Sequence, residues 1–248
     1  MTAHPEVPAC LAPLLDDLEA IPGVRAVVLG GSRALGREDG GSDWDIGVYY
    51  QGPIDLRALG RWGEFHPPGA WGRIMNGGAW LLIDRLKVDV LLRDVDVVDR
   101  WSDSARRGHF EIDLLLGYLA GVPTYSLLAE RSVARILRGA LPDAGEFPKR
   151  LAEVALERWR FHRRFTIEQA RSRAKRADLV GAIGQVAKAT VDEAHARLAG
   201  QRRWVLNEKR IVDDAGLDAA HSLFTDVPPR ATELRDWVDR AALLLESK

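Results

Sequence analysis

The 248-residue sequence predicts an α+β fold, in which an N-terminal mixed-sheet domain is followed by a C-terminal α-helical bundle. Short apolar runs alternate with glycine-rich turns over the first 140 residues, as is typical of a mixed α/β domain. Long stretches with helical spacing follow from residue 149. Because residues 139–148 have the Gly and Pro content of a linker, we expect two domains, residues 1–140 and 149–248.

In the first domain, alternating helical and strand-like patterns predict three helices, two strands and a β-hairpin. Apolar residues at helical spacing predict a first helix that Pro22 and Gly23 stop. Two later apolar runs flank Asp84 and Arg85, which is typical of a β-hairpin with a polar turn. In order, we expect a helix over 8–20, a buried strand over 24–29, a short polar helix from Ser32, a strand over 44–50, a hairpin over 79–93 and a helix over 94–106.

The second domain is predicted to be a small helical bundle. Helical spacing extends over residues 149–175 and 178–199, and a last helix is expected over about 230–246. Asp178 is a suitable N-cap for the second helix, and Gly200 is a suitable stop.

Composition excludes several classes of protein. The single cysteine, Cys10, excludes a disulfide scaffold, argues against a cysteine-based metal site and fits a reducing cytoplasm. No apolar run approaches the ~20 residues of a membrane helix, and Met1–Leu11 lacks the features of a secretory signal. We therefore expect a cytoplasmic protein with no membrane partner.

Charge is nearly balanced overall, with 35 Lys and Arg against 36 Asp and Glu, but it is unevenly distributed. Residues 149–176 hold ten basic and three acidic side chains, so an anionic partner could bind there. However, the sequence pI is near 6.6 and no aromatic residues form a stacking pattern with these charges. Strong nucleic-acid binding is therefore not indicated, although it is not excluded.

A glycine-rich turn directly after the strand over 24–29 predicts a phosphate-binding site. Gly30 and Gly31 allow backbone N–H groups to approach a polyphosphate closely, and Ser32 adds a hydroxyl donor.

Three aspartates predict a metal site beside this turn. Asp43 and Asp45 lie two residues apart in a strand, so their side chains share one face, while Trp44 should point into the core. Two adjacent carboxylates repel each other unless a cation lies between them, and they suit Mg²⁺. Asp89, flanked by valines in a later apolar strand, is the best third ligand, although pairing with Arg93 is an alternative.

The joint pattern resembles the nucleotidyltransferase superfamily of DNA polymerase β type. The matching positions are Gly31, Ser32 and Gly36, then Ser42, Asp43 and Asp45, then Asp89.

The resemblance implies a role for each of these residues. Asp43, Asp45 and Asp89 would be the catalytic residues that bind two Mg²⁺ ions, and Asp89 would also help to activate the attacking hydroxyl. Gly30, Gly31, Ser32 and Ser42 would hold the triphosphate of ATP, the expected co-substrate.

Beyond these motifs, the predicted architecture is similar to that of bacterial aminoglycoside and lincosamide nucleotidyltransferases. In such enzymes the acceptor lies between the two domains, often against carboxylates, and Glu111, Asp113, Asp192 and Glu193 are available. We expect Glu193 to face solvent, and a base role is the alternative. Within residues 204–210, Lys209 either belongs to a helix cap or contacts a nucleotide phosphate.

The leading functional prediction is transfer of AMP from ATP to a hydroxyl of a small molecule, such as an antibiotic of these two classes. Nucleotidylation of a protein or a tRNA is the catalytic alternative, and a non-catalytic nucleotide-binding module is the other. The sequence does not determine the acceptor, the nucleotide preference, any further general base or the oligomeric state.

Overall fold

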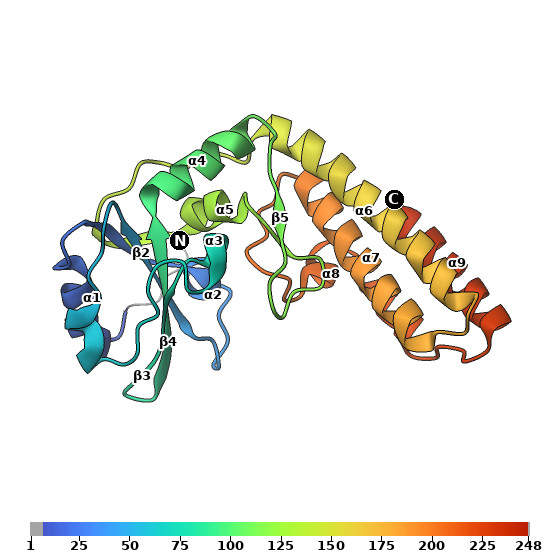
Figure 1. Cartoon of the computed structure of the whole chain (residues 1–248), viewed down its shortest axis with the longest axis horizontal. Helices are drawn as coiled ribbons and strands as arrows, with labels where there is room; N and C mark the ends of the chain where they lie inside the picture. The colour runs from blue at the N-terminus through green and yellow to red at the C-terminus, as the bar shows by residue number, and fades with distance from the viewer. Residues whose placement is uncertain (1–6, 248) are drawn as a thin grey trace. The chain divides into compact units, whose positions relative to one another are not determined.

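The computed structural model describes residues 7–247, so residues 1–6 and 248 of the predicted domains lie outside the described part. The chain forms two compact units. We call Met1–Asp103 with Leu127–Glu146 the sheet unit, and Ser104–Ser126 with Phe147–Lys248 the helical unit. A mixed sheet followed by helices confirms the predicted α+β class (Figure 1).

The sheet unit contains a five-stranded sheet in the order β3-β4-β2-β1-β7. β2 and β4 pair in parallel and the other neighbours are antiparallel, so the sheet is mixed. The strands are β1 (Val24–Leu29), β2 (Trp44–Tyr50), β3 (Gly78–Ile83), β4 (Leu86–Asp94) and β7 (Arg135–Gly139). The strands predicted over 24–29 and 44–50 and the hairpin predicted over 79–93 are confirmed.

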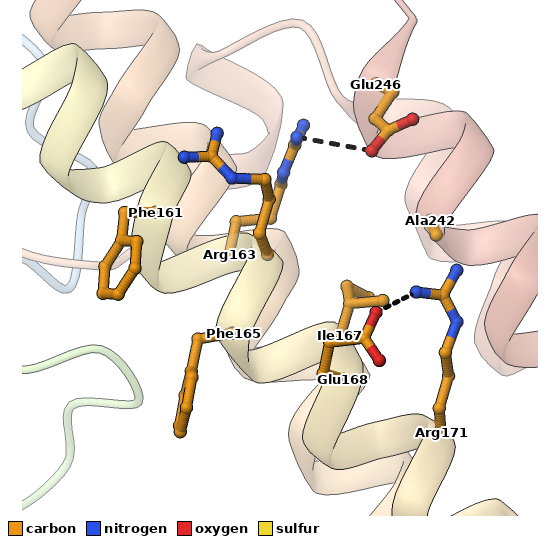
Figure 2. Close-up of a pocket in the computed structure, with 9 residues that line it drawn as sticks. Phe161, Arg163, Phe165, Ile167, Glu168, Arg171, Ala242 and Glu246 are labelled. Carbon is orange, nitrogen blue, oxygen red and sulfur yellow. Dashed lines mark hydrogen bonds and ion pairs between the residues drawn. The ribbon is translucent and has the colours of Figure 1, made fainter.

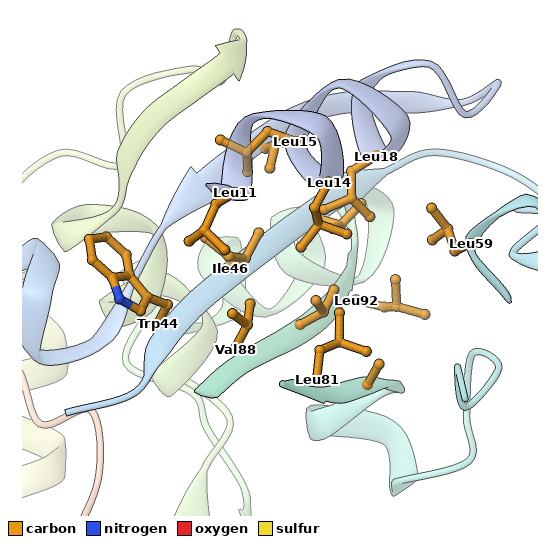
Figure 3. Close-up of a cluster of buried hydrophobic side chains, with 14 of the residues drawn as sticks. Leu11, Leu14, Leu15, Leu18, Trp44, Ile46, Leu59, Leu81, Val88 and Leu92 are labelled. Atoms are coloured by element: carbon orange, nitrogen blue, oxygen red, sulfur yellow. The ribbon is translucent and has the colours of Figure 1, made fainter. Parts of the chain in front are cut away.

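One face of the sheet is covered by the first helix. The short 3-10 turn η1 (Ala9–Leu11) leads into α1 (Ala12–Glu19), which confirms the predicted helix. Figure 3 shows the leucines of this segment above the strands, where they pack with alternate residues such as Ile46 and Val88. Each fully buried leucine contributes roughly 1.5–3 kcal/mol. The strand residues between these core positions therefore point to the opposite face of the sheet.

The turn between β3 and β4 fixes the register of this hairpin. Asp84 and Arg85 have φ angles of 47° and 68°, so both central residues adopt the left-handed conformation of a type I′ turn. Ile83 pairs with Leu86, and the pairing continues to Gly78 opposite Leu91.

Shorter helices complete the sheet unit. On the face opposite α1, Arg93 extends from β4 to Glu130 of α5, with N–O distances of 2.6 and 3.0 Å. The helix predicted over 94–106 is confirmed as α4. The helices are α2 (Gly31–Ala34), η2 (Arg57–Arg61), α3 (Gly72–Met75), α4 (Val95–Arg106) and α5 (Ser126–Val133).

The helical unit is organised around three long helices, which confirm the predicted bundle (Figure 1). They are α6 (Lys149–Ala174), α7 (Leu179–Gly200) and α9 (Ala231–Glu246). Asp178 caps α7 by accepting a 2.9 Å hydrogen bond from the Gly181 N–H, as predicted. The remaining elements are β5 (Ile112–Asp113), β6 (Val122–Pro123), α8 (Ile211–Asp214) and η3 (Asp218–Phe224). Within residues 7–247, no helix combines the length and apolar character required to cross a membrane.

Candidate functional site

Two of the predicted aspartates are direct neighbours in the sheet. Asp45 of β2 and Asp89 of β4 are register partners in the parallel pair. Partners in adjacent strands point to the same face, which here is the face opposite the α1 core. Both residues are only partly buried, so the carboxylates lie where a polar ligand can reach them.

The glycine turn after β1 lies directly against Asp45. The Gly30 N–H donates a 2.8 Å hydrogen bond to the Asp45 carbonyl. Gly31 has a φ of 61°, and a Cβ added there would lie 1.8 Å from Asp45 Oδ2. Ser32 follows in α2, immediately beside this contact. The backbone of the predicted phosphate-binding turn therefore lies so close to a predicted metal ligand, Asp45, that only glycine fits at position 31.

Arg33 holds the start of β2 in place, a role that the sequence analysis did not identify. Its Nη2 donates to the Ser42 carbonyl at 2.6 Å and its Nε to the Asp43 carbonyl at 3.1 Å. The guanidinium also lies 4.3 Å from the ring centroid of Trp44, which is buried as predicted. Arg33 thereby fixes the backbone that carries the two predicted acids.

Ser42 and Asp43 lie just before β2. The Ser42 hydroxyl donates to Asp39 Oδ1 at 3.1 Å and accepts from the Asp39 N–H at 2.9 Å. The hydrogen bond from the Gly41 N–H and, to a smaller extent, the one from the Ser42 hydroxyl lower the pKa of Asp39 below its ordinary value. The Ser42 hydroxyl, which was predicted to bind the triphosphate, is thus already hydrogen-bonded to Asp39 within its own turn.

The donor set is chemically suited to a hard divalent cation. Asp45 and Asp89 supply carboxylate oxygens from adjacent register positions, and Asp43 precedes Asp45 by two residues. Among residues 7–247, however, no three His, Cys, Asp or Glu side chains are already arranged as a metal-binding cluster. The strands bring together two of the three predicted ligands, and these residues fit the implied metal in ligand chemistry.

Lys209 belongs to the helical unit, in a turn before α8. Its N–H donates a 2.9 Å hydrogen bond to Asn207 Oδ1, so the asparagine caps the turn, and the lysine side chain is exposed.

The expectation that Glu193 faces solvent was wrong. This glutamate on α7 is only 2% exposed, and its carboxylate lies 3.1 Å from Arg163 Nη1 and 3.3 Å from Arg197 Nε. Its neighbour Asp192 is also buried, where Lys188 donates to it at 2.8 Å. Small alanines on α7 let α6 approach closely, so these polar positions lie inside the bundle rather than on its surface.

Replacing Glu193 by alanine should destabilise the helical unit by about 3–5 kcal/mol, because the buried Arg163 would lose its buried carboxylate partner and keep the exposed carboxylate of Glu246, 3.6 Å away. Urea unfolding followed by circular dichroism would measure this change. The matched control is Glu153→Ala, which removes an exposed ion pair with Arg150 and should cost less than about 1 kcal/mol. Equal effects of the two substitutions would contradict the buried-pair assignment.

Glu208, beside Lys209, anchors the loop between β5 and β6. Its carboxylate accepts hydrogen bonds from the N–H groups of Leu119 at 2.6 Å and Ala120 at 2.9 Å. Burial alone would raise the pKa of Glu208, but interactions with His195 and these two amides outweigh burial and lower it. Because His195 Nε2 lies 3.8 Å away, beyond hydrogen-bond distance, we attribute the lowering mainly to the amides.

Glu208→Gln should therefore have a pH-dependent effect on stability. The pKa of Glu208 is lower in the folded than in the unfolded state, so its stabilisation is present above the ordinary value of 4.5 and is lost as the pH falls through the folded value. We expect a loss of about 1–2 kcal/mol at pH 7, shrinking below pH 4.5. Urea unfolding at pH 7 and pH 4 tests this, with the exposed Glu157→Gln as control. A difference that grows on acidification would refute the assignment.

A separate pocket of about 270 Å³ lies on the helical unit, between α6 and α9 (Figure 2). Phe161 and Phe165 of α6 line it and are 59% and 60% exposed. Arg171 at its far end is held by Glu168 and Asp239. None of the residues predicted to bind nucleotide or metal lines this pocket.

The comparisons with known proteins identify the class of the sheet unit. Residues 11–99 match the family model described as a nucleotidyltransferase domain. This segment contains the glycine turn, Asp43, Asp45 and Asp89, and it is a nucleotidyltransferase domain, which confirms the predicted resemblance and enzyme class. Its general reaction is nucleotidyl transfer from a nucleoside triphosphate.

Among solved structures, the chain is similar to a nucleotidyltransferase-like protein from Exiguobacterium sibiricum 255-15. The identity is 12% and the TM-score 0.49, over 96% of this chain and 74% of that chain. No curated protein matches the sequence significantly.

Proposed function

We propose that the protein transfers AMP from Mg²⁺-bound ATP to a hydroxyl group of a small molecule. The observation that carries this proposal is the register pairing of Asp45 with Asp89, directly beside the Gly31 backbone. A pair of carboxylates next to a glycine turn can hold a metal–triphosphate complex. The carboxylates bind the cations, and the backbone of the turn can approach the phosphate oxygens closely.

In this proposal each residue has a defined task. Asp43, Asp45 and Asp89 hold the cations, while the backbone of Gly31 and the Ser32 hydroxyl orient the triphosphate. Gly30 shapes the turn, because its N–H is bonded to the Asp45 carbonyl. The acceptor oxygen attacks the α-phosphorus, the bond to the β-phosphate oxygen breaks and pyrophosphate leaves. The Asp89 carboxylate takes the proton of the attacking hydroxyl. When bound, Mg²⁺ would supply neutralisation of charge on the attacking and leaving oxygens.

Two predicted contacts to the triphosphate need a rearrangement or an independent test. The Ser42 hydroxyl would have to leave Asp39 to reach a phosphate. Lys209 is exposed and available, and Lys209→Ala with ATP-binding measurements would show whether it contributes.

A small acceptor is favoured because four of the ten basic residues in the stretch 149–176 are already paired within the helical unit. Internal partners reduce the charge available to a polyanion such as tRNA. The pairs are Arg163 with Glu193, Arg171 with Asp239, Arg173 with Asp178 and Arg150 with Glu153. An aminoglycoside-like or lincosamide-like compound would be such an acceptor, and the single cysteine supports a reducing cytoplasm as the location.

The test is transfer of label from α-³²P-ATP with and without Mg²⁺. Acceptors are an aminoglycoside and lincosamide panel, total tRNA and the protein alone, and Asp45→Asn is the control for dependence on the site. Labelled small molecule that requires both Mg²⁺ and Asp45 supports the proposal. Label in tRNA or in protein would replace it with macromolecule modification. Metal-independent ATP binding without any transfer would replace it with a binding module.

A further inference from the structure

An exposed tryptophan continues the row of acids across the sheet. Trp80 of β3 is the register partner of Asp89 in β4, and Asp89 is the partner of Asp45 in β2. Because register partners share a face, the three side chains emerge on the same side of the sheet. The neighbours of Trp80 along β3, Ala79 and Leu81, point to the other side and are buried in the core.

Trp80 does not stand alone on this face. Its ring stacks on that of Trp71, with centroids 4.6 Å apart and an interplanar angle of 22°. His66 contacts both rings, at centroid distances of 5.2 Å from Trp71 and 5.6 Å from Trp80. We call Trp80, Trp71 and His66 the aromatic platform.

The backbone around the platform is firmly held. His66 forms a β-bridge with Gly78, with N–O distances of 2.7 and 3.1 Å. A Cβ at Gly78 would lie 2.9 Å from Trp71 Cζ3, so the absence of a side chain there lets the indole lie against the strand. Asn76 fixes the intervening loop by donating to the Tyr50 hydroxyl at 3.0 Å and accepting from the Gly69 N–H at 2.9 Å.

The platform is nevertheless open to solvent, since Trp80 is 66% exposed. The platform gathers three aromatic side chains on one face beside polar groups, and a clustered apolar surface of this kind marks an interaction site. Indole rings bind the apolar face of other rings and also attract cations.

The sheet order decides which substrate the platform faces. Along the row the order is the glycine turn after β1, Asp45 on β2, Asp89 on β4 and Trp80 on β3. The triphosphate is assigned to the glycine end. The opposite end, beyond Asp89, is therefore left for the group whose hydroxyl loses its proton to Asp89.

We propose that the aromatic platform binds the acceptor, by stacking Trp80 against the face of a hydroxyl-bearing ring. This inference rests on the proposed function and specifies its acceptor as a ring compound, such as a sugar or cyclitol, with or without amino groups. Trp80 is then a residue that determines acceptor specificity and places the reacting hydroxyl next to Asp89.

Kinetics with Trp80→Ala test this assignment, using the acceptor that the labelling experiment identifies. We expect KM for the acceptor to rise about tenfold or more, with the KM for ATP unchanged and Trp80→Phe largely restoring binding. The matched control is Leu82→Ala, because Leu82 lies two residues further along the same strand face and is 71% exposed. An unchanged acceptor KM in Trp80→Ala, or a raised KM for ATP instead, would overturn the proposal.

A binding measurement keeps this test independent of catalysis. The chain contains eight tryptophans, so ¹⁹F NMR of protein labelled with 5-fluorotryptophan can follow each ring, with the Trp80 signal assigned from Trp80→Phe. The probes are tobramycin as a cationic ring compound, lincomycin as a second ring compound and α,β-methylene-ATP with Mg²⁺. A shift of the Trp80 signal with a ring compound but not with the nucleotide supports the platform, and the two compounds separate strongly cationic from weakly cationic acceptors.

Failure of the platform and failure of the proposed function give different results. If no ring compound shifts the Trp80 signal, or if only the nucleotide does, the acceptor assignment is wrong even when transfer occurs. If the signal shifts but no label is transferred by the wild-type protein, ring binding stands and the proposed reaction fails.

Discussion

Asparagine at Asp45 or at Asp89 should lower the rate of nucleotidyl transfer by at least about 10³-fold, equivalent to several kcal/mol of transition-state stabilisation. The substitution preserves size but removes the negative charge that a divalent cation requires. Because the two side chains are register partners, loss of either one damages the same site. The double variant should consequently be little worse than either single variant.

Transfer of label from α-³²P-ATP measures this effect, and Mg²⁺ binding by calorimetry separates lost binding from lost chemistry. Asp84→Asn is the matched control, since Asp84 lies in the turn of the same hairpin with a φ of 47° that asparagine tolerates. All variants should unfold at similar temperatures. Wild-type transfer by folded Asp45→Asn protein would remove this residue from the site.

Alanine at Gly31 should reduce kcat/KM for ATP by about 10²-fold or more, because one methyl group displaces a proposed metal ligand. The added Cβ would lie 1.8 Å from Asp45 Oδ2 and 2.6 Å from its Cγ. Either the Asp45 carboxylate or the glycine turn must move. The proposed metal ligand and the proposed triphosphate-binding turn therefore cannot both keep their positions.

The positive φ of Gly31 carries a cost of its own, which a second glycine can separate from the steric effect. Gly52 has a φ of 79° and open space around its Cβ position, whereas Gly31 has a φ of 61° and meets Asp45. Gly52→Ala should lose about 1 kcal/mol of stability at most and retain activity. Equal activity losses in the two variants would show that backbone strain, rather than contact with Asp45, explains the effect.

Local patterns in the sequence were sufficient to predict most elements of the fold. Helical spacing and the Pro22–Gly23 stop placed α1, and the two apolar runs around Asp84 and Arg85 placed the β3–β4 hairpin. The elements that were not predicted are short or depend on distant partners. Both α5 and β7 are of this kind, since β7 is stabilised by pairing with β1 more than 100 residues earlier.

The candidate site was predictable as a set of residues but not as a geometry. Spacing of two predicts that Asp43 and Asp45 share one face, although Asp43 lies just before β2, whereas the register between Asp45 and Asp89 depends on a parallel pairing that no local pattern encodes. For the same reason the position of Trp80 could not be predicted, because its relation to the site depends on its pairing with Asp89. Arg33 offered no sequence signal, because its partners are backbone carbonyls.

The helical pattern of the sequence did not reveal that Glu193 is buried inside the bundle. A glutamate at position 193 suggests an exposed helix face, yet the partner that makes burial tolerable, Arg163, lies 30 residues away on α6. Charge pairing between helices cannot be deduced from the pattern of one helix.

The division of the chain into units also has a consequence for how this protein can be cut. The chain leaves the sheet unit at Asp103, contributes Ser104–Ser126 to the helical unit and then returns to build α5 and β7. Trp159 of α6 donates a 3.0 Å hydrogen bond to Tyr125 of this excursion. A cut near residue 140 would thus leave the whole sheet in the first fragment. The second fragment would contain the long helices but lack Ser104–Ser126, which belongs to the helical unit. The two units are interleaved in sequence, and neither can be gained, lost or exchanged by a single break in the gene.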